Sequence, residues 1–429
     1  MVQISKVNLQ NFKTHENLIF EPNNITIVTG KNNSGKTSLL EAIELCFSPD
    51  NVRRYEGLVE NLIRSGSNES TVRCEYSGAT GQAKLTEFID EGATQELILK
   101  RLSNNQKHSV ARQLFLRQIN SNRGVVRRLV DEEGDQNIRS ELKSLLRRAV
   151  EIVFDEMRSD EEVDEYVSGG ILVEQSGNQV PFLYFSDTFS DLIGDIADTF
   201  SSSISESSAS ITVDEHEVQW AVESLFRGLV VGRYGSGNFV GTLESNAAVK
   251  MVSELDIAEK DIEGHEESSI VLSRVEDSIR KYNLLPEIKS FNSEDVVFNQ
   301  DNQRHQIPHK FMGDGFRAIT GLLWELHVSE MEEYVLLLEE PENSMHPGYI
   351  KKLVHFFVSV SRDEGVQMII TTHDVDLINA FLNPTLDETE SYLEENLGIL
   401  KIQKYAAQHL DFAEARKHLN ELHLDLRGE

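Results

Sequence analysis

The segment Gly30–Thr37, which reads GKNNSGKT, restricts the possible folds of this chain more than any other feature. It matches the phosphate-binding pattern G-x-x-x-x-G-K-[ST] in full. A strand-like run over 24–29 precedes it, and Lys36–Phe47 follows with its apolar residues on one face of a helix. The glycines let successive backbone N–H groups point at phosphate oxygens, and the helix adds the positive end of its dipole. We therefore predict a phosphate-binding loop (P-loop) between a buried strand and a helix.

The residue types in this loop suit the binding of ATP and Mg²⁺. A lysine in this place reaches the β- and γ-phosphates, and the hydroxyl after it coordinates Mg²⁺. We therefore predict that Lys36 is catalytic and that Thr37 is a metal ligand, in addition to their contacts with the nucleotide. The loop residues predicted to bind the nucleotide are Gly30, Asn33, Ser34, Gly35, Lys36 and Thr37.

A second signal is the apolar run over 334–338, which ends in Glu339 and Glu340. A buried strand that ends in two carboxylates suits metal binding and general base catalysis. We predict that Glu339 holds the water shell of the metal and that Glu340 polarises the attacking water. Two glutamates at a strand end are by themselves often only solvated charge, so this prediction depends on the P-loop beside them.

Two further segments near the C-terminal end extend the pattern. The run over 368–374 predicts a buried strand followed by His373, which can hydrogen-bond a γ-phosphate and register its presence. The turn over 311–317 lies directly before a helix, where glycine N–H groups and an arginine form an anion site. Taken alone, His373 would be interpreted as a structural histidine and the turn over 311–317 as a helix cap. With the P-loop, we predict a catalytic role for His373 and nucleotide contacts for Gly313, Asp314, Gly315 and Arg317.

The order of predicted elements indicates an α/β fold. Strands alternate with helices at both ends of the chain, which favours a mostly parallel sheet covered on both faces. Segments near 70–77, 83–90 and 96–101 alternate like strands of an antiparallel β-lobe. We predict a nucleotide-binding core split by a long insertion, with residues 1–105 as its first half, 106–290 as a mainly helical insertion and 291–429 as its second half.

Within the predicted insertion, three segments stand out. The runs over 169–186 predict a β-hairpin, and the serine-rich stretch 201–208 predicts a flexible linker. Residues 246–283 are polar and compatible with a helix. They form either a surface helix or an arm for dimerisation.

Charge is unevenly distributed in this acidic chain, whose formal net charge is −31. Such a field repels nucleic acid, so any DNA contact must be local. Two alternatives explain this net charge: a host with a salt-rich cytoplasm, or an ordinary acidic protein surface. Residues 101–148 carry eleven Lys or Arg and five Asp or Glu, whereas 151–227 carry two and eighteen. The basic block is either a docking surface, for DNA among others, or is neutralised by the acidic segment.

The chain is expected to reside in the cytoplasm and not in a membrane. Its two cysteines, Cys46 and Cys74, imply no disulfide framework. No run approaches the roughly 20 apolar residues that cross a bilayer, and the N-terminal stretch lacks a signal peptide's apolar block.

The order of these motifs resembles the ABC-type ATPases that include RecF, SMC and OLD proteins. Residues 1–50 and 305–380 carry the resemblance, through NFKTHENLIF, GKNNSGKT, IPHKFMGDGFRAITGLL, LLLEEPENSMHP and IITTHD. These segments are similar to OLD-family ATPases and the related RecF-like AAA15/AAA21 proteins. Glu339 departs from the usual ABC aspartate, although an E-E-P-E sequence is frequent in the OLD group.

The resemblance implies an ATP-hydrolysing enzyme that uses ATP and Mg²⁺ and works as a homodimer or larger oligomer. Each ATP would lie between Lys36 of one subunit and Gly313–Gly315 of another, with Glu342 and Asn343 near the partner's site. OLD nucleases add a Toprim nuclease domain, for which the 56 residues after His373 (429 − 373) are too few.

The resemblance therefore implies a standalone regulatory subunit with a separate effector such as a nuclease, as in antiphage defence. Two alternatives stay open. One is a RecF-like ATPase of DNA repair or recombination that binds DNA through residues 101–148. The other is a nucleotide-gated scaffold with little turnover.

Overall fold

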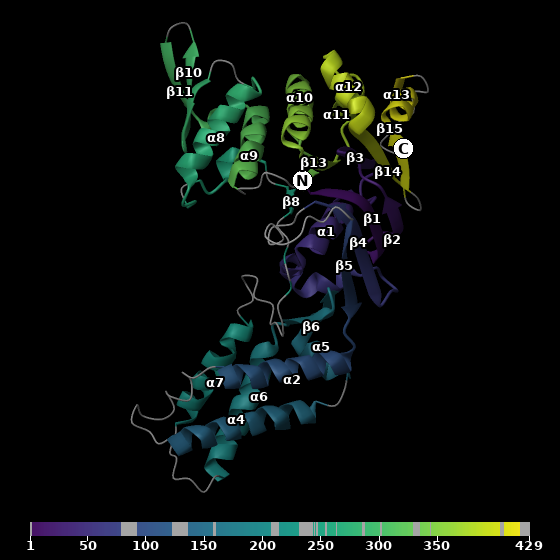
Figure 1. Cartoon of the computed structure of the whole chain (residues 1–429). Helices are drawn as coiled ribbons and strands as arrows, with labels where there is room; N and C mark the ends of the chain where they lie inside the picture. The colour runs from purple at the N-terminus through teal and green to yellow at the C-terminus, as the bar shows by residue number, and fades with distance from the viewer. Residues whose placement is uncertain are drawn as a thin grey trace. The chain divides into compact units, whose positions relative to one another are not determined.

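The computed structural model of the chain divides into two compact units (Figure 1). Unit 1 comprises Met1–Ser48, Val72–Glu96 and Ser245–Glu429, and unit 2 comprises Pro49–Thr71 and Leu97–Glu244. The structure describes residues 2–78, 92–121, 136–157, 160–206, 214–230, 243, 245, 248–253, 255–262, 264–284, 288–300, 303–328, 335–343, 345–403 and 407–420.

A mostly parallel six-stranded sheet forms the centre of unit 1, in the order β15-β14-β3-β13-β12-β8. Five strands run parallel and β15 pairs antiparallel with β14. Residues of β3, β12 and β13 are apolar and almost wholly buried, as a sheet covered on both faces requires. The bounds are β3 Ile25–Gly30, β8 Val249–Val252, β12 Val335–Glu339, β13 Gln367–Thr371, β14 Leu397–Ile402 and β15 Ala407–Asp411.

Helices cover both faces of this sheet. Alternate strand residues, among them Leu336, Leu338 and Ile370, share a core with helices α8 to α11, whereas α1 contacts β3, β8, β12 and β13. The bounds are α1 Lys36–Phe47, α8 Ser268–Lys281, α9 Asp314–Val328, α10 Pro347–Glu364, α11 Val375–Leu382, α12 Asp387–Asn396 and α13 Phe412–Asn420. The predicted strand, loop and helix around Gly30–Thr37 are confirmed.

Antiparallel strands complete unit 1. Strands β1 and β2 pair with each other, and β9, β10 and β11 form a three-stranded sheet that leads into the turn His309–Phe311 before α9. Strands β4 and β5 each continue into unit 2. The bounds are β1 Gln3–Phe12, β2 His15–Phe20, β4 Glu69–Ser77, β5 Ala93–Arg101, β9 Ile288–Phe291, β10 Asp295–Gln300 and β11 Gln303–Pro308. Strands β4 and β5 confirm the predicted strands near 70–77 and 96–101, whereas the segment 83–90 lies outside the described residues.

Unit 2 packs helices around an aromatic core that includes Phe115, Phe154, Phe189 and Phe226. The predicted hairpin over 169–186 is confirmed by the antiparallel pair β6 and β7. The bounds are α2 Asn104–Ser121, α4 Gln136–Glu156, α5 Asp160–Tyr166, α6 Phe189–Glu206, α7 Glu215–Val230, β6 Val167–Gln175 and β7 Asn178–Phe185, with a 3₁₀ segment over Pro49–Leu62.

The structure corrects the predicted linker at 201–208. Helix α6 continues to Glu206 because Phe200 and Ile204 are buried on its apolar face. The hydroxyls of Ser203 and Ser205 donate to backbone carbonyls four residues earlier, so these serines fit the helix. The rest of that stretch, residues 207 and 208, lies outside the described residues.

Residues 245–284, which the sequence assigned to the insertion, belong to unit 1. Strand β8 pairs in parallel with β12. Helix α8 buries Val271, Val275 and Ile279 and packs against α9. The segment is therefore a structural part of the nucleotide-binding core, since its apolar face is covered by that core.

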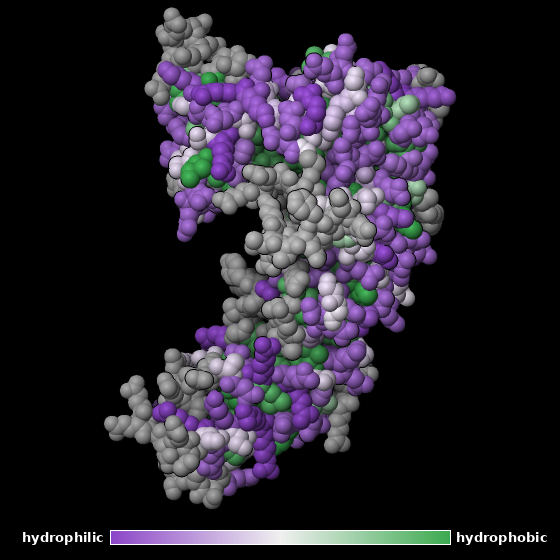
Figure 2. Space-filling model, viewed as in Figure 1, coloured by the Kyte–Doolittle hydropathy of each residue, from purple (hydrophilic) through white to green (hydrophobic). Residues whose placement is uncertain are grey.

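The visible surface is mainly hydrophilic, with hydrophobic side chains scattered over it (Figure 2). The large exposed hydrophobic residues include Leu58, Trp220 and Phe311. Within the described residues, the helices are too short or too polar to cross a membrane.

Gly321 in α9 allows a close crossing between that helix and the chain near Leu255. A Cβ at position 321 would lie 1.7 Å from the carbonyl oxygen of Leu255. We expect Gly321→Ala to lower the free energy of unfolding by about 3 kcal/mol, because the helix must move away. Urea denaturation measures this change. The matched control is Gly194→Ala in α6, where a Cβ meets nothing within 4 Å. It should raise stability by roughly 0.5–1 kcal/mol, and equal effects in the two variants would contradict the close crossing.

Candidate functional site

The P-loop depends on glycine at both of its ends. Strand β3 ends at Gly30, and α1 begins after Gly35, whose φ is 99°. A Cβ at Gly30 would lie 2.5 Å from the carbonyl oxygen of Ile402. A Cβ at Gly35 would lie 2.5 Å from the Thr14 hydroxyl oxygen. The surrounding backbone and side chains therefore leave room for glycine alone.

The interior of the loop fits phosphate groups. The Lys36 ammonium donates to the carbonyl oxygens of Gly30 at 3.0 Å and Lys31 at 3.3 Å, so it lies folded over the loop. Burial lowers the pKa of this lysine, and the neighbouring glutamates oppose that shift. The Ser34 hydroxyl is buried without a hydrogen-bond partner. A positive charge and an unpartnered hydroxyl are the groups that a bound phosphate satisfies.

Thr37 and Glu339, the predicted metal ligands, lie side by side. The Thr37 hydroxyl donates to Glu339 Oε1 at 2.5 Å, across 302 residues of sequence. Thr37 lies in the first turn of α1 and Glu339 ends β12, so the contact follows from packing of α1 against the sheet. Hydroxyl and carboxylate oxygens are hard ligands of the kind that Mg²⁺ takes. The arrangement fits Mg²⁺, and metal binding by these two residues stays a prediction.

Glu340 and His373, two predicted catalytic residues, are also brought together. His373 Nδ1 lies 2.9 Å from Glu340 Oε1. Glu340 has a left-handed backbone with φ 43°, and its N–H donates to the Thr371 carbonyl at 3.0 Å. In a continuing strand, Glu339 and Glu340 would point to opposite faces. The left-handed backbone of Glu340 ends this strand alternation. As a result, the Glu339 carboxylate contacts Thr37 and the Glu340 carboxylate contacts His373.

Glu342 contacts the end of β13 in its own chain, and its place near a partner's site stays a prediction. Its side chain is only 3% exposed and accepts a hydrogen bond from the hydroxyl of Thr372 in the same chain. Burial raises the pKa of Glu342 to about 7, with smaller contributions from the charges of Asp374 and Glu340. Glu342 therefore faces the strand end that carries His373, within its own subunit.

His15 contacts the P-loop and was missed from the sequence. Its Nε2 lies 2.9 Å from the carbonyl oxygen of Gly35, and its ring is buried. Burial lowers the pKa of His15, which favours the neutral ring. The residue begins β2, and no sequence pattern indicated that the start of this strand lies beside the loop.

The glycine turn before α9 is not joined to the P-loop in this chain. Arg317 pairs with Asp256 and Asp314 and donates to the Lys310 carbonyl. Among the described residues, hydrogen bonds and ion pairs of this turn reach neither the P-loop nor the carboxylates after β12. A Cβ at Gly313 would meet nothing within 4 Å, so the turn is open at that point, whereas Gly315 packs against the ring of Tyr349. Nucleotide contact by Gly313, Asp314, Gly315 and Arg317 stays a prediction.

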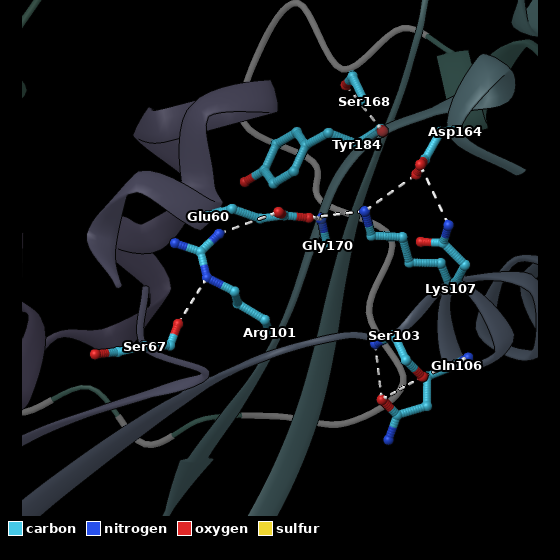
Figure 3. Close-up of polar contacts among 11 residues, drawn as sticks. Glu60, Ser67, Arg101, Ser103, Gln106, Lys107, Asp164, Ser168, Gly170 and Tyr184 are labelled. Atoms are coloured by element: carbon cyan, nitrogen blue, oxygen red, sulfur yellow. Dashed lines mark hydrogen bonds and ion pairs between the residues drawn. The ribbon is translucent and has the colours of Figure 1, made fainter. Parts of the chain in front are cut away.

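Three residues of the basic block, Arg101, Lys107 and Arg112, form ion pairs with acidic side chains. Lys107 Nζ lies 2.9 Å from Glu60 Oε1 and 3.5 Å from Asp164 Oδ1 (Figure 3). Arg101 pairs with the other oxygen of Glu60, and its Nε donates to the Ser67 carbonyl at 3.0 Å. Arg112 of α2 pairs with acidic residues of α4. For these three residues, the contacts favour the interpretation in which opposite charges neutralise each other. Arg147 and Arg148 of the same block are exposed, and residues 122–135 lie outside the described residues.

Comparison with family models covers most of the chain. The family described as "AAA domain, putative AbiEii toxin, Type IV TA system" matches residues 70–379. The model described as the "P-loop containing region of AAA domain" matches residues 1–57.

Curated relatives match over short segments. The DNA replication and repair protein RecF of Chlorobaculum tepidum is 35% identical over 88 residues, which cover 19% of this chain and 22% of RecF. The DNA double-strand break repair Rad50 ATPase of Methanopyrus kandleri is 33% identical over 79 residues, 18% of this chain and 9% of Rad50. The chain thus spans about a fifth of the length of this RecF protein. The SMC head domain from Thermotoga maritima superposes with a TM-score of 0.41 and 11% identity over 95% of this chain and 98% of that domain.

The left-handed backbone at Glu340 predicts an unusual order of stabilities. Glu340→Gly and Glu340→Ala both remove the carboxylate and its contact with His373. We expect the glycine variant to be about 1 kcal/mol more stable, because a φ of 43° is strained for alanine but not for glycine. Chemical denaturation of the two variants measures the difference. An alanine variant of equal or greater stability would show that the backbone at 340 is not left-handed.

The raised pKa of Glu342 predicts a pH dependence of stability. Below the ordinary glutamate pKa, Glu342 is protonated in both folded and unfolded states. As the pH rises towards 7, only the unfolded chain ionises, so the free energy of unfolding falls by up to about 3 kcal/mol. Glu342→Gln is neutral at every pH and should lose this part of the decline. Denaturation of both proteins between about pH 5 and pH 8 tests the expectation, and parallel curves would contradict it.

Proposed function

The chain belongs to the AbiEii-type AAA-domain family, and we propose that it is an ATP-hydrolysing switch that works by pairing two copies. It is a P-loop ATPase of the RecF-like ABC type. One observation carries the proposal. The predicted phosphate, metal and catalytic groups meet at the carboxyl ends of three neighbouring parallel strands, β3, β13 and β12. Ligands of open α/β sheets bind at such an edge.

Each side chain at this edge has a distinct part in the proposed reaction. Lys36 would place positive charge at the phosphates, while Thr37 and Glu339 would hold Mg²⁺, which neutralises phosphate charge when bound with ATP. Glu340 would orient the attacking water and take its proton. His373 holds Glu340 through Nδ1, which leaves Nε2 for a hydrogen bond to the nucleotide.

We propose a second copy of the chain because the described contacts of the turn before α9 do not reach the P-loop of its own chain. Gly313 is open, and Asp314 is exposed at the start of the helix. N–H groups in the first turn of a helix can hold an anion. We propose that this turn contacts the nucleotide bound by another copy, so that ATP joins two subunits.

For the biological role, we propose a regulatory ATPase of a toxin–antitoxin or antiphage defence system, with a separate effector protein such as a nuclease. The family description, which names a toxin of a type IV system, supports this role. A DNA-repair role is the second candidate, supported by the RecF and Rad50 relatives. The ion pairs of Arg101, Lys107 and Arg112 within unit 2 count against the 101–148 block as a DNA surface.

ATP turnover of the purified chain tests the enzymatic proposal. We expect Glu340→Gln to reduce the turnover rate by about 100-fold or more, because the amide cannot take the proton of water. Glu388→Gln, at an exposed position of α12, is the matched control and should keep the wild-type rate. Equal rates in wild type and Glu340→Gln would show that this carboxylate is not the base.

The same assay with linear duplex DNA, at low and high salt, separates the two biological roles. We expect turnover that does not respond to DNA. A several-fold increase at low salt would instead favour the DNA-repair role.

ATP-dependent association tests the shared site. Glu340→Gln with ATP and Mg²⁺ should sediment as a dimer or larger oligomer, because ATP stays bound between subunits. Lys36→Ala under the same conditions should not associate. If Glu340→Gln sediments as a monomer when saturated with ATP, the shared site is wrong.

A further inference from the structure

Two carboxylates in the turn after β12 hold the end of β13 at neighbouring positions. Glu340 contacts His373, and Glu342 accepts a hydrogen bond from Thr372, the residue before that histidine. The hydroxyl oxygen of Thr372 also accepts the Asp374 N–H at 2.9 Å. The hydroxyl proton is therefore directed to Glu342, and His373 lies between two residues that this bond network restrains.

Glu342 is not a surface carboxylate that pairs by chance. Glu342 and Thr372 are both buried, and the Glu342 carbonyl oxygen accepts the Met345 N–H at 2.9 Å, which ties the turn together. Its second carboxylate oxygen, Oε2, is buried with no hydrogen-bond partner. Burying such an oxygen costs stability, so an apolar residue would serve a purely structural role better.

The surroundings of Glu342 connect it to the nucleotide site. Asp374 at the start of α11 and Glu340 act on it with like charge. Lys36 of the P-loop lies close enough for the charge of Glu342 to raise the lysine pKa. The carboxylate thus contacts the β13 end and acts on the phosphate-binding lysine through its charge.

We propose that Glu342 is a positioning residue, which acts through Thr372 to set the orientation of His373 against Glu340 and the nucleotide. The inference rests on the proposed ATPase function and assigns this side chain an intrasubunit role. Because Lys36 and the P-loop keep their own contacts, Glu342 affects the turnover rate and not the binding of ATP.

Steady-state kinetics of the full chain tests the role. Glu342→Ala and Thr372→Val each remove the bond, and each should lower kcat about tenfold while KM for ATP stays within about twofold. Glu342→Gln keeps an oxygen acceptor and Thr372→Ser keeps the hydroxyl, so both should restore most of kcat. The double variant should lose no more than Thr372→Val alone, since Thr372→Val already removes the bond to Glu342 together with the one from the Asp374 N–H. Losses that multiply, or a change in KM alone, would overturn the proposal.

The His373 ring signal in nuclear magnetic resonance spectra provides a readout without turnover. With a non-hydrolysable ATP analogue, the signal should move in Thr372→Val and stay in Thr372→Ser. This pair also replaces Glu342→Ala if that variant does not fold. If the signal moves in Thr372→Val but the wild-type protein hydrolyses no ATP, the positioning of His373 is supported and the ATPase proposal is wrong. An unmoved signal, in a protein whose turnover Glu340→Gln abolishes, overturns positioning and leaves the ATPase proposal in place.

Discussion

The hydrogen bond between Thr37 and Glu339 joins the two halves of the nucleotide-binding core. It exists because β3 and β12 lie on either side of β13 in one parallel sheet, so that the P-loop and the carboxylates emerge at the same edge. Unit 2 and the segment 245–284 lie between them in sequence without interrupting this arrangement. Without the parallel pairing, neither a metal site nor a base could form beside the loop.

The site concentrates negative charge around a single buried ammonium. Burial lowers the pKa of Lys36, and Glu340, Glu339 and Glu342 act in the opposite direction. These carboxylates and a triphosphate would repel each other strongly in a partly buried site. The proposed reaction therefore needs a divalent cation to neutralise this charge, and Glu339 is the carboxylate predicted to hold it. Glu342 avoids part of this repulsion because burial raises its pKa to about 7.

Unit 2 presents a different electrostatic arrangement. Arg101 and Lys107 near the start of α2 pair with Glu60 and Asp164, and Arg112 within the helix pairs with Glu151 and Asp155 of α4. The family model spans both units, so unit 2 is part of the shared architecture.

The P-loop, the strands β12 and β13, the β6–β7 hairpin and the residues expected at the site could all be predicted from the amino-acid sequence. These signals are local, because a glycine pattern, an apolar run and a turn depend on neighbouring residues. The folded chain was needed to see that β8 and α8 belong to the core, that α6 continues through Ser201–Ser205, and that His15 lies beside Gly35. It also decided the left-handed backbone of Glu340 and the burial of Glu342. Burial and backbone torsion at these positions are set by segments distant in sequence, which no local pattern records.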